Sequence, residues 1–181
     1  DEYLVHRALI DTGAFDRLFD RYWDRIVRYC YYRLGSWIDA EDAAQRVVVK
    51  YTKGLTGFHF RGDPNAFQRW VFTLARNETI DSYRHEQRKR EVALSERFSL
   101  IYPGPTPEEE AMLAATHGWL RELFALLPPA QREVMEYLSA DLTTPEIARL
   151  LDKREENIRQ LISRARVGLS ALMRESGERN G

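Results

Sequence analysis

Apolar side chains recur every three to four residues along most of this 181-residue chain, and alternating strand-like runs are scarce. Near the N-terminus, for example, Leu18, Tyr22 and Ile26 follow one face of a helix. Such spacing lets each helix bury one stripe against its neighbours while its other faces stay polar. The sequence therefore predicts an all-α protein.

A proline-rich segment interrupts this periodicity. Pro103, Pro105 and Pro107 are followed by three glutamates, a composition typical of a linker. Helical spacing resumes at Ala111. We therefore predict two small helical domains joined by a flexible linker. The predicted limits are 1–90 for the first domain, 91–112 for the linker, 113–176 for the second domain and 177–181 for a tail.

Composition and charge narrow the classes of protein. Hydrophobic residues make up 44% of the chain, enough to build real cores. Because the net charge is -1, any contact with DNA must come from local clusters of Arg and Lys. No stretch approaches the roughly 20 apolar residues that span a membrane, and the start lacks a signal-peptide pattern. We expect a cytoplasmic protein that does not insert into membranes.

The sequence offers little for catalysis or for holding a cofactor. Cys30, the one cysteine, can form neither an intramolecular disulfide nor a Cys-rich zinc site. His59 and His85 lack metal-ligand partners at suitable spacing. Neither a phosphate loop nor a nucleophile elbow occurs. We expect no cofactor, no metal and no enzymatic activity.

Three main helices are predicted in the first domain. Asp39 is expected to cap the second of them. One face of that helix is expected to carry Ala43, Val47, Lys50 and Tyr51. Glycines at 54, 57 and 62 with Pro64 then predict a loop, and a third helix follows from about 66 to 90.

The second domain contains a tight helical hairpin. Its first helix can begin in two ways: Thr144 can cap it with Pro145 at the first position, or Thr143 and Glu146 can form a capping box. A second helix follows a polar break and buries a stripe that starts at Ile158. Groups able to bind DNA lie on its other side or just before it: Arg154, Asn157, Arg159, Gln160, Ser163, Arg164 and Arg166.

Such a hairpin suits a helix-turn-helix, because Arg bonds guanine edges or phosphates while Asn and Gln read adenine. The alternative is an ordinary helical hairpin whose polar face is simply solvated. The residue pattern alone leaves both alternatives open.

Short motifs of the second half closely resemble region 4 of the extracytoplasmic-function sigma factors. These motifs are Leu126-Leu127-Pro128, Gln131-Arg132-Glu133-Val134, Leu142-Thr143, Glu146-Ile147-Ala148, Ile158-Arg159 and Arg164-Ala165-Arg166. The resemblance implies that the last helix reads the -35 element of a promoter.

The first half is similar to region 2 of the same family, and the whole resemblance covers about 14–174. The motif Ala40-Glu41-Asp42-Ala43-Ala44-Gln45 looks like the helix that binds the clamp of RNA polymerase. The implied polymerase contacts are Asp39, Asp42, Gln45 and Arg46.

Residues 58–63 resemble the loop that takes up a flipped base, and the following helix resembles the one that melts the -10 element. The implied -10 contacts are Phe58, Phe60, Arg61, Trp70, Arg76, Asn77, Arg84 and Arg88. Aromatic rings stack on unpaired bases and cations hold the backbone, so these residue types suit strand opening. Two alternatives stay open: Trp70 can belong to the core, and Asn77 can be a solvated residue.

Three residues depart from the family pattern. Arg46 stands where an acidic residue is usual, Asp152 replaces the usual turn glycine, and Leu161 replaces a common basic residue. The main hypothesis is a sigma factor that binds core RNA polymerase and promoter DNA, with an anti-sigma factor as a further partner. The alternative is a stand-alone DNA-binding regulator with a sigma-like fold that has lost the usual core binding.

Overall fold

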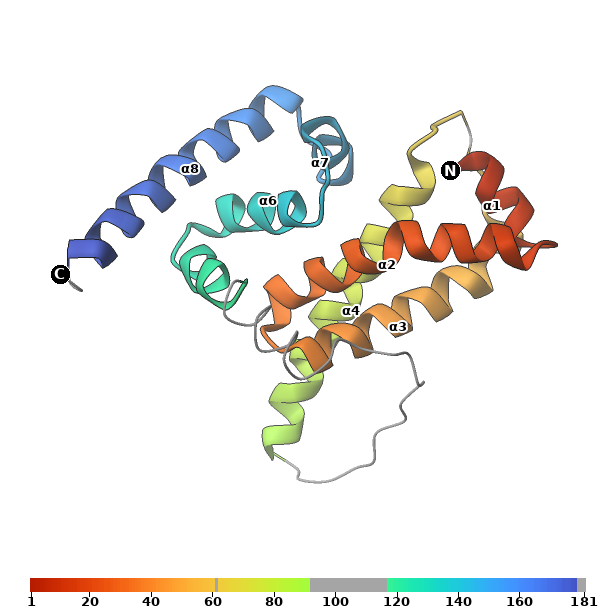
Figure 1. Ribbon diagram of the computed structural model, residues 1–181, viewed down its shortest axis with the longest axis horizontal. Coiled ribbons are helices and arrows are strands. Elements are labelled where there is room, and N and C mark those ends of the chain that lie inside the picture. The colour runs from red at the N-terminus through yellow and green to blue at the C-terminus, as the bar shows by residue number, and fades with distance from the viewer. Residues whose placement is uncertain (61, 92–116, 179–181) are drawn as a thin grey trace. The chain divides into compact units, whose positions relative to one another are not determined.

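The computed structural model describes residues 1–60, 62–91 and 117–178, and the regular elements in these ranges are all helices (Figure 1). They form two compact units, here the first unit (1–91) and the second unit (117–178). The prediction of an all-α protein with two helical regions is confirmed. Nearly all of the predicted linker lies outside the described residues, so its limits stay predictions.

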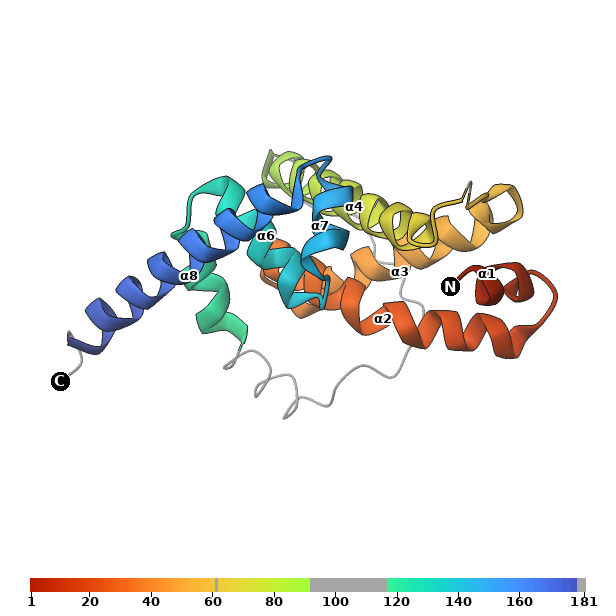
Figure 2. The same ribbon diagram turned by 90° about the horizontal axis from the view of Figure 1, so that it is seen from above.

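Four helices and one short turn build the first unit. They are α1 (Glu2–Ala8), α2 (Thr12–Leu34), α3 (Trp37–Gly54), the 3-10 turn η1 (Leu55–Gly57) and α4 (Ala66–Glu91). The helix α2 packs against α1, α3 and α4, and α3 also packs against α4 (Figure 2). Asp11 caps α2 by accepting a hydrogen bond from the Gly13 N–H at 3.0 Å, and Gly35 ends α2 in the left-handed conformation, with φ of 83°.

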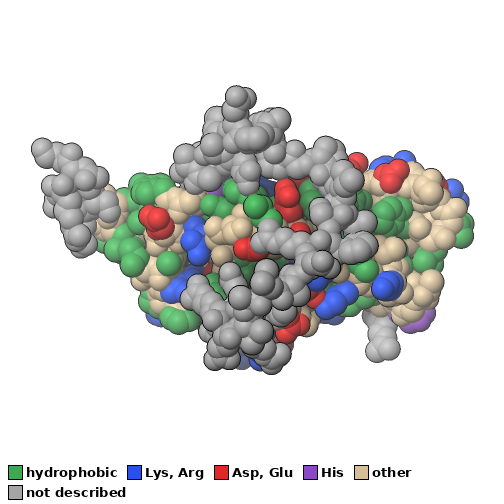
Figure 3. Space-filling model, turned by 90° about the horizontal axis from the view of Figure 1, so that it is seen from below, with side chains coloured by type: hydrophobic (Ala, Val, Ile, Leu, Met, Phe, Trp, Pro, Cys, Tyr) green, Lys and Arg blue, Asp and Glu red, His purple; other side chains and the backbone are tan. Residues whose placement is uncertain are grey.

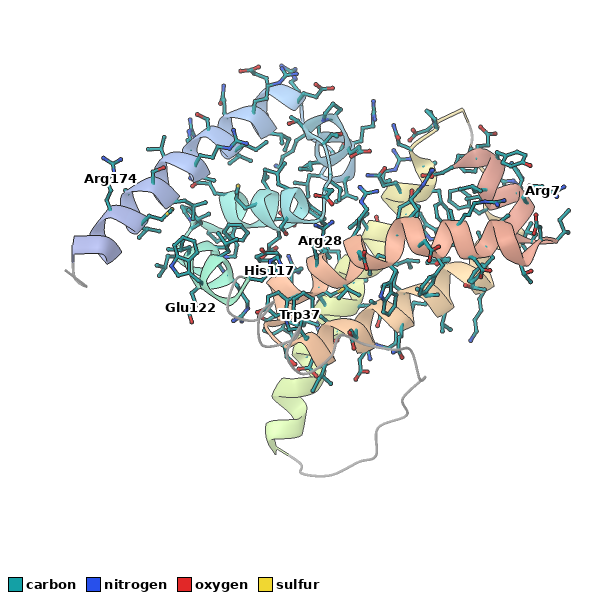
Figure 4. The ribbon with its side chains drawn as sticks, in the orientation of Figure 1. Arg7, Arg28, Trp37, His117, Glu122 and Arg174 are labelled. Atoms are coloured by element: carbon teal, nitrogen blue, oxygen red, sulfur yellow. The ribbon has the colours of Figure 1, made fainter. Side chains whose placement is uncertain are left out.

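Aromatic rings fill the core of this unit. Phe67 meets Tyr22 and Tyr51 edge to face, with ring centroids 5.4 and 5.7 Å apart, and all three residues are fully buried. Near the start of α3, Trp37 stacks on Tyr31 with centroids 4.1 Å apart (Figure 4). Tyr22, Tyr51 and Phe67 come one from each long helix, so aromatic contacts, which contribute beyond the area that they bury, join α2, α3 and α4.

Cys30 lies inside this core. It is fully buried, and burial raises the pKa of its thiol to about 12. A thiol held neutral in this way behaves as a small apolar side chain.

One prediction about α3 was wrong, and another holds with one residue at the edge of its face. Ser36, not Asp39, caps the helix: the Ser36 hydroxyl accepts a hydrogen bond from the Asp39 N–H at 3.3 Å. Asp39 stands one turn further on, where its carboxylate favours the positive end of the helix dipole. Val47 and Tyr51 are fully buried, but Lys50 is exposed, because it lies at the edge of the face where its ammonium reaches α4.

The second unit is built from a helical stretch at 117–125, α6 (Pro129–Ser139), α7 (Thr144–Leu150) and α8 (Glu155–Glu178). The helix α8 packs against α6 and α7. Arg132 ties α6 to the preceding stretch: its guanidinium donates to the backbone oxygens of Phe124, Ala125 and Leu127 at 2.6–3.2 Å. These carbonyls lie at the end of the preceding helical stretch, where the Leu127 N–H also donates to the Phe124 oxygen at 3.0 Å, so the Arg132 side chain helps to cap that end.

The start of α7 shows which of the two predicted caps is used. Thr143 is the N-cap of α7, and Glu146 accepts a hydrogen bond from the Thr143 N–H at 2.7 Å in a capping box. After α7, Asp152 adopts the left-handed conformation with φ of 51°, as the position of a turn glycine requires. In the described part of the chain, no helix is both long and apolar enough to cross a membrane.

Candidate polymerase and nucleic-acid interface

The outward side of α3 carries a narrow stripe of four residues, Ile38, Asp42, Gln45 and Val49, here called the α3 stripe. Their spacing of four, three and four residues places them above one another on the helix surface. Ile38 is 50% exposed and Val49 is 38% exposed, although both are large apolar residues. Exposed apolar side chains beside a carboxylate and an amide suit a protein partner more than bare solvent. Of the predicted polymerase contacts, the α3 stripe holds Asp42 and Gln45, and Asp39 lies nearby.

Arg46, the fourth predicted polymerase contact, is held by α4. Its Nε donates to the Glu78 carboxylate at 2.8 Å, and its Nη2 donates to the Ser82 hydroxyl at 2.9 Å. Lys50, one turn further along α3, forms an ion pair with the same carboxylate. Glu78 is only 3% exposed. Sequence spacing gave no sign of this contact, because 32 residues separate Arg46 from Glu78.

A stacked aromatic pair lies between the loop and the start of α4. Phe58 and Trp70 have centroids 4.9 Å apart and ring planes tilted by only 20°. Both are partly exposed. Trp70 lies against the backbone of Gly54, where a Cβ atom would come within 2.5 Å of the indole. The lack of a side chain at Gly54 therefore leaves the space that the indole occupies.

Phe60, also a predicted DNA contact, has a different place. It is 6% exposed and meets Phe58 edge to face at 5.1 Å, with His6 on its other side at 6.0 Å. A ring so enclosed offers little surface to an unstacked base, so we assign Phe60 to the support of the loop. Arg61 lies outside the described residues.

On α4, Trp70, Asn77 and Arg84 follow one another at intervals of seven residues and form one stripe, here called the α4 stripe. Asn77 and Arg84 are exposed, so Asn77 is free of the core. Arg84 pairs loosely with Asp81 at 3.8 Å. Arg76, also exposed, lies beside this stripe. The side chain of Arg88 lies outside the described residues.

Every predicted -35 contact on or before α8 is exposed, whereas Ile158, Ile162 and Ala165 are buried. The exposed residues form two parallel stripes: Asn157, Gln160 and Arg164 in one, and Arg159, Ser163 and Arg166 in the other. Arg154 lies just before the helix. This arrangement fits a helix that presents one whole face to a groove.

Acidic residues accompany these cations. Glu155 and Glu156 in the first turn of α8 lie 2.9 and 3.6 Å from the Arg159 guanidinium. Where side chains are coloured in Figure 3, basic and acidic groups are interspersed. Because the positive charge is partly balanced, contacts with DNA depend on geometry at particular side chains more than on one broad basic field.

The described residues do not meet the requirements of a metal site. Across residues 1–60, 62–91 and 117–178, no three His, Cys, Asp or Glu side chains gather in a way that could hold a metal ion.

Two family profiles match the chain, one for each unit. The profile described as Sigma-70 region 2 matches residues 18–89, and the profile described as Sigma-70, region 4 matches residues 117–169. The first match contains the α3 and α4 stripes, and the second contains both stripes of α8.

Individual relatives agree with the profiles. The extracytoplasmic-function RNA polymerase sigma factor ShbA of Streptomyces griseus is 31% identical over 179 residues, which cover 93% of each chain. BldN of Streptomyces coelicolor, described in the same way, is 30% identical over 94% of this chain, which spans 64% of BldN. A solved complex of the sigma factor RpoE with the anti-sigma factor NepR from Bartonella quintana shares the fold. Its TM-score is 0.60 at 19% identity, over 88% of this chain and 96% of that chain.

Proposed function

Because this chain belongs to the extracytoplasmic-function family of RNA polymerase sigma factors, we propose that it binds core RNA polymerase and directs it to promoters. The first unit docks on the polymerase and opens the -10 element, and the second unit binds the -35 element. The chain itself carries out no reaction. Its place of action is the bacterial cytoplasm, where polymerase and promoter meet.

The observation that carries this proposal is the α4 stripe. It sets a partly exposed Trp70, stacked on Phe58, in line with an exposed Asn77 and Arg84. An unpaired base needs an aromatic surface and hydrogen-bonding groups at its edge, and its backbone needs a cation. All three are available along one face of one helix.

The α3 stripe is the proposed polymerase contact. Asp42→Arg places a cation between Ile38 and Gln45 without changing the buried side of α3. We expect this variant to bind core polymerase at least tenfold more weakly while its circular dichroism stays that of the parent. Unchanged affinity in a folded variant would remove this assignment.

Binding and opening of DNA are proposed to reside in different units. Asn77→Ala should leave closed-complex binding nearly intact yet slow strand opening, because an extruded base is held only after it unpairs. Filter binding paired with permanganate footprinting on one promoter measures both steps. Arg7→Gln, at an exposed position of α1 outside the α4 stripe, is the control. Normal opening by Asn77→Ala together with a loss in Arg159→Ala would mean that the assignment is reversed.

A stand-alone DNA-binding regulator is the second candidate, and Arg46 is the residue that favours it. Arg46 stands where the family usually has an acidic residue, and its guanidinium is paired with Glu78. A pull-down with core polymerase separates the candidates: retention of the polymerase supports a sigma factor, and its loss supports a regulator that acts alone.

An anti-sigma factor is a further proposed partner. The solved RpoE relative shares the fold and was captured with such an inhibitor. An inhibitor that covers the α3 stripe would compete with core polymerase, so competition between the two in a binding assay tests this partner.

A further inference from the structure

A buried carboxylate joins the proposed polymerase helix to the proposed DNA-opening helix. Glu78 on α4 accepts from Arg46 at 2.8 Å and pairs with Lys50, and both cations come from α3. Arg46 also donates to Ser82, one turn after Glu78. These four residues are here called the α3–α4 polar cluster.

The same turn of α4 is also tied to α2. The Nε of Arg33 donates to the Thr79 hydroxyl at 2.9 Å, and the Tyr83 hydroxyl donates to the backbone oxygen of Arg33 at 2.8 Å. Polar contacts from two different helices therefore meet on residues 78–83 of α4. This stretch of α4 is held in place by α2 and α3 together.

Stability alone is a weak reason to keep such an arrangement. A carboxylate that is almost fully buried loses its hydration, and a well-packed apolar side chain at the same helix contact often stabilises a protein as much or more. What a pair with fixed geometry adds is one preferred register between two helices, as a buried polar residue does in coiled coils. The α3–α4 polar cluster has such a fixed geometry, because Arg46 reaches two acceptors one turn apart.

The α3–α4 polar cluster lies next to both the α3 stripe and the α4 stripe in the sequence. Arg46 directly follows Gln45 of the α3 stripe, and Glu78 directly follows Asn77 of the α4 stripe. A change of register between α3 and α4 would shift Asn77 relative to a polymerase that holds α3.

We propose that Glu78 is a positioning residue for promoter opening, which it serves by locking α4 to α3 through Arg46 and Lys50. This inference rests on the proposed function as a sigma factor. Glu78 is not a DNA contact in this proposal: it sets where Asn77 lies once the polymerase is bound.

The test uses holoenzyme assembled from core polymerase and the full chain, on one promoter, at a temperature where each variant is fully folded by circular dichroism. Glu78→Gln keeps the size of the side chain and removes its charge. We expect core polymerase affinity and closed-complex affinity within twofold of the parent, and a rate of strand opening that is five- to tenfold lower. Arg7→Gln removes the exposed Arg7–Asp11 pair of the same unit and should leave all three quantities unchanged.

Two further variants separate positioning from loss of stability. Arg46→Lys keeps the charge but cannot hold both acceptors, so it should open DNA three- to fivefold more slowly than the parent at unchanged core polymerase affinity; this variant tests the proposal even if Glu78→Gln fails to fold. Arg46→Met alone and Arg46→Met combined with Glu78→Gln complete a cycle, in which the loss of the double variant should be smaller than the product of the two single losses, because both changes break the Arg46–Glu78 contact.

Opening at the parental rate by folded Glu78→Gln would overturn the proposal. So would a multiplicative loss in the double variant, because Arg46 would then act independently of Glu78. Failure of the parent itself to open any promoter with core polymerase would remove the proposed function, and the inference with it; that result is distinct from a defect confined to Glu78→Gln.

Discussion

The two units use the same charged residue types in different ways. In the first unit the main ion pairs cross between helices and end on a carboxylate that is 4% exposed. In the second unit Arg159 pairs along its own helix with Glu155 and Glu156, whose side chains are 44% and 67% exposed. Exposed pairs of this kind contribute little to stability and can be exchanged for other partners. The first unit therefore uses its charges to fix internal geometry, and the second keeps its charges available for a ligand.

The two units also differ at their left-handed positions. The turn after α2 has Gly35 with φ of 83°, whereas the turns of the second unit have Asp141 and Asp152 with φ of 58° and 51°. Aspartate tolerates this conformation less well than glycine does. The turns of the helix-turn-helix are therefore less relaxed than the turn that joins α2 to α3.

The largest expected effect separates the cores. Phe67→Ala should destabilise the first unit by about 3–5 kcal/mol, because it removes a fully buried ring that contacts Tyr22 and Tyr51. Chemical denaturation followed by tyrosine and tryptophan signals measures the loss. The transition of the second unit should stay in place; a shared loss would show that the two units unfold together.

DNA binding gives the next effect. Arg159→Ala should cost about 1–3 kcal/mol if Arg159 reads a guanine, and it should relax the preference at one base pair. Arg166→Ala, if that residue holds a phosphate, should weaken all sequences alike and flatten the salt slope by about one unit. Binding titrations over a set of single-base promoter variants at several salt concentrations distinguish the two roles. Equal losses on every sequence from Arg159→Ala would make it a backbone contact.

A pair of turn variants sharpens the second contrast. Gly35→Ala should destabilise the first unit by about 1 kcal/mol, because alanine is strained in a left-handed backbone. Asp152→Gly should instead stabilise the second unit by up to about 1 kcal/mol. Thermal unfolding of both variants tests this difference of sign, which a loss of stability in Asp152→Gly would contradict.

The smallest expected effect is the slow reaction of the Cys30 thiol in the native protein. Folding raises the pKa of its thiol from 9.0 to about 12, so the neutral form is the one that the folded state favours. This contribution to stability is complete below about pH 9 and is lost as the pH rises toward 12. At about pH 8, below both values, a disulfide reagent should react with the native protein only as fast as the first unit opens. Rapid reaction under native conditions would show that the aromatic core admits the reagent.

Local patterns in the sequence predicted much of the fold. Helical spacing predicted α2, α4 and α8. Where two residues of suitable type stood near the start of a helix, the pattern did not decide which of them caps it. Thr143 and Thr144 were both able to cap α7, and Ser36 replaced Asp39 as the cap of α3. Moving the start of a helix by one to three residues leaves its apolar stripe unchanged, so the stripe cannot distinguish between the two caps.

The sequence did not predict which distant residues contact one another. Arg46 appeared only as a departure from a family pattern, because nothing in its neighbourhood identifies Glu78 as its partner. The burial of Phe60 likewise depends in part on His6, which α1 brings to the loop from a distant part of the sequence. The family resemblance indicated which surfaces to expect, whereas the internal partners that hold those surfaces came from the structure.

The buried position of Cys30 has a practical consequence for single-molecule work. It is the one cysteine of the chain and it lies inside the aromatic core, so a cysteine introduced at an exposed position would be the only thiol within reach of a maleimide dye. Asp20 on α2 and Ala130 on α6 are exposed, lie in different units and belong to none of the stripes on α3, α4 or α8. A donor and an acceptor at these two positions would report the distance between the units as polymerase, promoter or inhibitor is added, without any need to remove a native cysteine first.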